Sequence, residues 1–103
     1  MNKFRRAQLR TLAATLSQIE SVQERDMLED CIGTLEDIRY DEEEYFENMP
    51  ENLQGSTRGY AAEEAIDNMD QAIESLNDAL DADENEDFLD DIGTAIQYIW
   101  DCI

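Results

Sequence analysis

The sequence predicts an all-α protein, a small helical bundle of three or four helices built on an antiparallel helix hairpin. Apolar residues recur at spacings of three and four through most of the 103 residues, which is the period of an amphipathic helix. One Pro and four Gly are too few for the many turns of a multi-stranded sheet. Leu, Ile, Met and Ala supply most of the apolar volume, as in packed helices. We expect one domain, because a chain of this length builds a single core.

The first expected element is a basic helix over residues 3–20, and the second is a helix over residues 22–48. Between them, Ser21 and Glu24 have the spacing of a capping box. The apolar stripe changes phase there, so either one helix ends and another begins near Ser21, or a single long helix continues through a stutter. We favour the break. The apolar stripe of the first helix comprises Leu9, Leu12, Leu16 and Ile19, and that of the second includes Leu28, Leu35 and Ile38.

A turn over residues 48–57 should end the second helix, because the residue before Pro50 avoids the helical region. Pro50 suits the first position of a short helical turn, which Asn48 could cap. We expect Ser56 or Thr57 to cap the helix that follows.

Helices over residues 58–82 and 84–102 complete the domain. Asp83 and Glu86 are expected to form a capping pair at the start of the last helix. The apolar stripe of helix 58–82 should face that of helix 22–48 in the hairpin. This stripe comprises Ile66, Met69, Ile73, Leu76 and Leu80.

Two glycines and two cysteines lie within expected helices. Gly33 and Gly93 each sit in an Ile-Gly-Thr triplet, and we expect close packing to explain them, because Gly costs about 1 kcal/mol relative to Ala in a helix interior. Cys31 and Cys102 fall on buried faces, without the spacing of metal or redox cysteines. We interpret both as reduced core residues.

Charge is the strongest compositional signal, because 27 Asp and Glu against 7 Lys and Arg give a formal net charge of −20. Phosphates and anionic membranes would be repelled, so we expect no direct nucleic-acid binding and no membrane docking. Intrinsic disorder is the alternative interpretation of such an acidic composition, but the periodic apolar residues favour a folded chain. With no apolar run of membrane-spanning length and no signal-peptide pattern, we expect a location in the host cell cytoplasm.

The acidic runs are the candidate partner-binding residues. Charge runs are usually solvated helix faces, but here the compensating cations at i,i+4 are missing. From Asp26 onward there are 25 acids, all but Glu20 and Glu24 of the 27, against only Arg39 and Arg58. We expect Arg58 to pair with nearby acids. The first run comprises Asp41, Glu42, Glu43, Glu44 and Glu47, and the second comprises Asp83, Glu84, Glu86, Asp87, Asp90 and Asp91.

Catalysis and metal binding are not expected. The chain has no His, which removes conventional triads and histidine-bearing zinc sites, and no carboxylate pair stands out as a catalytic acid and its partner. The alternation that starts at Asp81 resembles the opening of an EF-hand loop. It has Glu86 where glycine is required and Ile92 where a bidentate Glu is required. We therefore expect no enzymatic activity, no cofactor and no metal site.

The segment Asn48-Met49-Pro50-Glu51-Asn52-Leu53-Gln54, between the acidic run before it and the amphipathic helix after it, resembles a group of small acidic bacteriophage and prophage proteins. The resemblance covers residues 36–80. It implies a helix, an Asn-hydrophobic-Pro-Glu-x-Leu-Gln turn and a second amphipathic helix, and a phage origin. Most members of the group are uncharacterised, so it implies no mechanism. The Pro50 turn itself is either a recognition loop or, as we favour, a connector.

Our leading hypothesis is that the acidic helices mimic nucleic-acid charge and inhibit a host nucleic-acid-binding or defence protein. Carboxylates three or four positions apart on a helix lie about 5–6 Å apart, which is comparable to phosphate spacing. The alternative is a helical homo-oligomer or interaction protein, assembled through the basic N-terminal helix. A sponge for a signalling nucleotide is a third possibility. The candidate self-association residues are Lys3, Arg5, Arg6 and Arg10.

Overall fold

Four long helices account for most of the computed structural model, which describes all 103 residues and contains no strand. The all-α prediction is confirmed. A 3-10 turn, η1 (Val22–Glu24), leads into the second long helix, and a four-residue helix, α3 (Glu51–Gln54), separates the second from the third. The long helices are α1 (Lys3–Ser17), α2 (Arg25–Glu47), α4 (Thr57–Asp81) and α5 (Asn85–Asp101).

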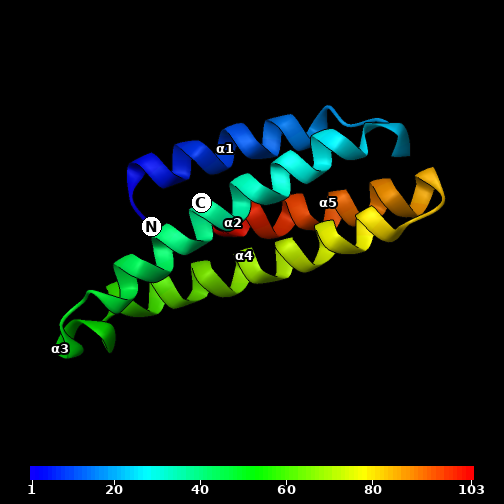
Figure 1. The fold of residues 1–103 in the computed structure, drawn as a ribbon. Helices are drawn as coiled ribbons and strands as arrows, with labels where there is room; N and C mark the ends of the chain where they lie inside the picture. Colours follow the sequence, from blue (N-terminus) through cyan, green and yellow to red (C-terminus); the bar gives the residue numbers. More distant parts are fainter.

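The helices form an elongated bundle in which each long helix runs opposite to the one before it (Figure 1). Helix α4 packs against α2 and α5, and α1 contacts the same two neighbours less extensively. Because α2 and α4 are longer than α1 and α5, their connected ends project beyond the bundle and carry α3 at the tip (Figure 1). The resulting rod measures 48 × 20 × 17 Å.

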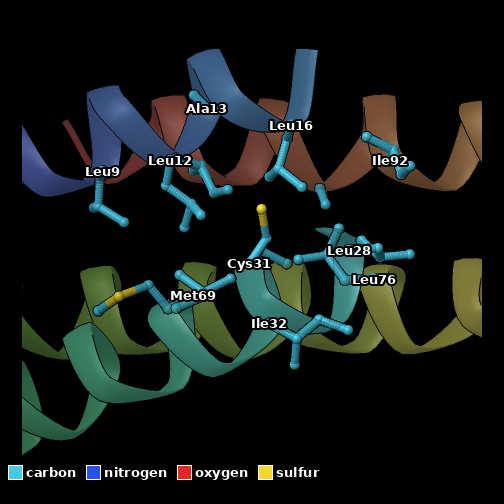
Figure 2. Close-up of a cluster of buried hydrophobic side chains, with 14 of the residues drawn as sticks. Leu9, Leu12, Ala13, Leu16, Leu28, Cys31, Ile32, Met69, Leu76 and Ile92 are labelled. Atoms are coloured by element: carbon cyan, nitrogen blue, oxygen red, sulfur yellow. The ribbon is translucent and has the colours of Figure 1, made fainter. Parts of the chain in front are cut away.

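The core runs along the axis of the rod, where the apolar stripes of the four long helices meet. In Figure 2, Leu12 and Leu16 of α1 point toward α2, whose Cys31 points back toward α1. Both cysteines are buried, as predicted, and neither forms a disulfide. The residues with no exposed side-chain surface include Leu9, Leu16, Leu28, Leu35, Met69, Leu76, Phe88 and Ile99.

A break separates α1 from α2, and α1 ends at Ser17, three residues before the expected end. Ser21 accepts a hydrogen bond from the backbone N–H of Gln23 at 3.3 Å, so it caps η1. The expected capping box does not close, because the Glu24 carboxylate accepts from the Glu20 N–H at 3.0 Å instead. The stripe changes phase here because the chain leaves the helix.

The α3 turn is held by backbone hydrogen bonds and by the side-chain amide of Gln54, which donates to the carbonyl oxygens of Phe46, at 3.3 Å, and Met49, at 3.2 Å. Pro50 precedes α3 without a side-chain cap, so Asn48 does not fill the capping role expected of it, whereas Ser56 caps α4 by accepting from the Gly59 N–H at 3.4 Å. A Cβ on Gly59 would lie 2.0 Å from the carbonyl oxygen of Gln54. Glycine at this position therefore permits α3 and α4 to approach.

The explanation expected for the other helical glycines is wrong. A Cβ on Gly33 or Gly93 would meet no atom within 4 Å, and both residues are exposed. Their place in the helices is thus not due to close packing, and the structure supplies no other reason for them.

The α4–α5 connection is held from outside by η1 and α2. Arg25 donates to the carbonyl oxygens of Leu80, at 3.3 Å, and Ala82, and places its positive charge at the C-terminal end of α4. The side-chain oxygen of Asn85 accepts from the Val22 N–H at 2.9 Å. The predicted Asp83–Glu86 capping pair is absent, because the capping position of α5 falls on Glu84, whose side chain makes no capping bond.

Candidate acidic interaction surface

Nearly all of the negative charge lies on the surface. Of the 27 carboxylates, only Glu42 is buried. Three of the 27, those of Glu42, Glu43 and Asp70, take part in ion pairs, which leaves 24 without a cationic partner. Helices α2, α4 and α5 therefore present a surface whose charges repel one another and attract positive charge.

Three of the few cations, Arg5, Arg25 and Arg39, make contacts within the molecule. Arg25 binds the end of α4 and lies over the Phe88 ring, 6.0 Å from its centroid. Arg39 joins α2 to α4 through Asp70, whose carboxylate oxygen is 2.6 Å from Nε, and it also pairs with Glu43. These hydrogen bonds, that to Asp70 foremost, raise the pKa of Arg39. Arg58 makes no ion pair, contrary to expectation, so its charge lies free at the start of α4.

Glu42 does not belong to the exposed candidate residues. Its side chain has 0% exposure, and its Oε1 accepts a hydrogen bond from Arg5 Nε at 2.8 Å. The amino group of Met1 lies 3.3 Å from Oε2. Arg5 also lies over the Tyr45 ring, 5.3 Å from its centroid. This buried cluster fastens the start of α1 to α2, and Arg5, with 12% side-chain exposure, is unavailable for self-association.

The two acidic runs lie at opposite ends of the rod (Figure 1). The first run, now without Glu42, occupies the last turns of α2 near α3. There Glu43 and Glu47 face Glu63 and Asp67 of α4 across a shallow hollow of about 390 Å³. The second run occupies the α4–α5 link and the first turns of α5. One compact site therefore cannot contain both runs.

Three residues of the second run, Asp87, Asp90 and Asp91, line a larger acidic hollow at the α4–α5 end. This hollow has a volume of about 450 Å³, and Ala82 is its only lining residue that is not acidic. Desolvation, reinforced by the charges of its neighbours, raises the pKa of Asp91. We call this feature the acidic hollow, and its carboxylates are those of Asp78, Asp81, Asp87, Asp90 and Asp91.

Two members of the acidic hollow, Asp78 and Asp81, were not among the predicted partner-binding residues. They lie one turn apart at the end of α4, and a link of only three residues brings that end beside the first turns of α5. The shortness of this link is the feature of the sequence that could have predicted that Asp78 and Asp81 lie beside the α5 carboxylates. Asp83, Glu84 and Glu86 are exposed but do not line the hollow.

Comparison of the chain with family models, curated proteins and solved structures gives no match. No three His, Cys, Asp or Glu side chains are grouped in an arrangement that could hold a metal ion. None of the helices has a stretch long and apolar enough to cross a membrane.

The outer surface of α1 contrasts with the rest of the molecule. Helix α1 contains no Asp or Glu, and Lys3, Arg6 and Arg10 are exposed on it without an ion-pair partner. Arg6 lies beside a smaller hollow that Glu64 and Asp101 also line. Three of the four predicted self-association residues are thus accessible.

Proposed function

We propose that this protein binds a basic, nucleic-acid-binding protein and inhibits it by presenting the charge of a nucleic acid. The linear charge density of the rod is the observation that carries the proposal. Duplex DNA bears one charge per about 1.7 Å of axis, so a duplex as long as the 48 Å rod bears about 28 phosphates. The protein places 27 carboxylates and a net charge of −20 over that length.

The shortage of cations close to the carboxylates supports the same proposal. A protein adapted for stability alone gains from i,i+4 pairs of opposite charge, yet Arg39–Glu43 is the only such ion pair here. The acidic hollow at the α4–α5 end has no cation in its lining, which suits it to receive Lys or Arg side chains from a partner. A basic groove that binds nucleic-acid phosphates would meet a similar negative electrostatic field on this protein.

The resemblance of residues 36–80 to phage-encoded acidic proteins supplies the biological setting of the proposal. In that setting the target is a host defence or nucleic-acid-binding protein in the cytoplasm, and the protein is an inhibitor without enzymatic activity of its own. The chain contains no histidine, and its carboxylates serve as fixed charges.

Affinity capture tests this function directly. The immobilised full-length protein is exposed to a bacterial lysate, and bound proteins are eluted either with duplex DNA or with salt. We expect the DNA eluate to contain one or a few basic nucleic-acid-binding proteins, and retention to weaken as salt screens the charges. Captured proteins that DNA does not displace would contradict charge mimicry.

A second candidate function, self-association through α1, is favoured by a different observation. Lys3, Arg6 and Arg10 are exposed and unpaired on the only long helix without an acid. A second copy offers acidic surfaces that complement them. The two functions are compatible, because α1 and the acidic hollow lie on different parts of the rod.

A further inference from the structure

An apolar groove of about 540 Å³ lies between α1 and α2. Phe4, Ala7 and Leu12 supply the apolar part of the α1 wall, and Met27 and Cys31 supply that of the α2 wall. The remaining lining residues are polar: Gln8, Thr11, Thr15, Asp30 and Thr34. Asp30 is the only charged residue in its lining. In a chain that is one-third charged, a nearly uncharged groove of this size differs sharply from the remaining surface.

Large apolar side chains at the two ends of the groove are left without cover. Phe4 is 69% exposed and Met27 is 38% exposed. Between them the groove extends from Phe4 to Thr15 along α1, which at 1.5 Å per residue corresponds to about 16 Å, or three helical turns. A groove of this length can accept the side chains from three turns of an opposing helix.

The charges flanking the groove are arranged so that the face complements itself. One flank is α1, with exposed Lys3 and Arg10 and no acid. The other is α2, where Asp30 is followed two turns later by the exposed Asp37. Each flank therefore attracts the opposite flank of an identical surface.

We propose that two copies of the chain associate through this groove, around a two-fold axis parallel to it. This axis places α1 of one copy over α2 of the other, so cationic and acidic flanks meet twice. An axis across the groove would instead place α2 against α2 and oppose their acids. In the proposed dimer, Phe4 and Met27 are covered by the facing helices. The inference rests on the second candidate function, self-association, and is independent of charge mimicry.

Salt dependence distinguishes this contact from binding to a basic partner. Two bodies of charge −20 repel one another over long distances, so dimerisation must overcome that repulsion. The Debye length falls from about 30 Å at 0.01 M salt to about 3 Å at 1 M, which suppresses long-range repulsion more than it weakens contact pairs. The dimer should therefore strengthen with salt, whereas a complex with a basic protein should weaken.

Sedimentation of the full-length chain over a wide concentration range, at low and high salt, tests the proposal. We expect a monomer–dimer equilibrium with the dimer at twice the 11.9 kDa protomer mass. Phe4→Glu should raise the dimer dissociation constant by about tenfold or more, because it removes a buried aromatic contact and adds a charge. Tyr60→Glu is the matched control: Tyr60 is 62% exposed on α4, outside the groove, so this variant should dimerise normally.

A charge exchange supplies the second variant. Arg10→Glu should weaken the dimer, and adding Asp30→Arg should restore it. Far-UV circular dichroism verifies that each variant keeps its helices. A dimer that Phe4→Glu and Arg10→Glu leave unchanged would overturn the groove as the interface while leaving self-association intact. A chain that stays monomeric at every concentration and salt level would overturn both, and the groove would then belong to a partner of different chemistry.

Discussion

Replacing Gly33 and Gly93 with Ala should stabilise the protein. Both lie inside long helices, and a Cβ at either position meets no atom within 4 Å, so the substitution introduces no clash. Ala is favoured over Gly in a helix interior by about 0.8–1 kcal/mol. The two sites lie on different helices and share no contacts, so the effects should add to about 2 kcal/mol. For a domain of this size, that gain corresponds to a rise in Tm of roughly 8–16 °C.

Urea and thermal unfolding, followed by far-UV circular dichroism, measure the effect. The matched variant is Gly59→Ala, which should lower stability, because its Cβ would lie 2.0 Å from the Gln54 carbonyl oxygen. A double variant at Gly33 and Gly93 that unfolds at or below the wild-type midpoint would refute the conclusion that these glycines have free space. A stabilising Gly59→Ala would refute the close contact between α3 and α4.

Leu76→Asp should abolish cooperative thermal unfolding, because Leu76 has 0% exposure and an unpaired charge would enter the core; an unchanged Tm would place Leu76 outside it. Asp91→Asn should stabilise the protein at neutral pH. The raised pKa of Asp91 means that its charged form destabilises the folded state relative to its protonated form. The stability that the protonated form contributes is lost as pH rises through the folded-state pKa. Below about pH 4 Asp91 is protonated in both states, so the advantage of Asn should disappear there. Burial raises the pKa of Cys102 to about 12, so iodoacetamide should label it only after denaturation, whereas rapid native labelling would contradict its burial.

Features that depend on local periodicity could be predicted from the sequence. The helical class follows from the spacing of Leu9, Leu12 and Leu16 and of similar stripes, because burying one face of a helix leaves a period in the sequence. The break near Ser21 follows from the phase change. Capping was predicted less well: a box pattern specifies which groups can bond, but the chain path decided that Glu24 reaches Glu20 rather than Ser21.

Features that depend on contacts between distant residues could not be predicted in the same way. Glu42 stands in a run of acids, and only the packing of α1 on α2 reveals that it is buried against Arg5, 37 positions away. Gly33 and Gly59 show the same limit, because the space around a glycine depends on its neighbours in the fold. The acidic hollow was predicted in part, since its α5 carboxylates were selected without Asp78 and Asp81.

Neutralising the second acidic run tests the central claim most directly. Its six carboxylates are replaced by the corresponding amides, and affinity for the captured partner is measured by titration calorimetry with and without competing DNA. A control variant loses six scattered, exposed carboxylates that line none of the hollows or the groove, so the two variants have equal net charge. The run comprises Asp83, Glu84, Glu86, Asp87, Asp90 and Asp91, and the control positions are Glu20, Asp26, Glu29, Glu36, Glu51 and Glu74.

Charge mimicry centred on the α4–α5 end predicts that the first variant stays folded and loses binding. The control should retain most of its affinity, and DNA should compete with the wild-type protein for the partner. Full-strength binding by the neutralised variant, unaffected by DNA, would contradict the account.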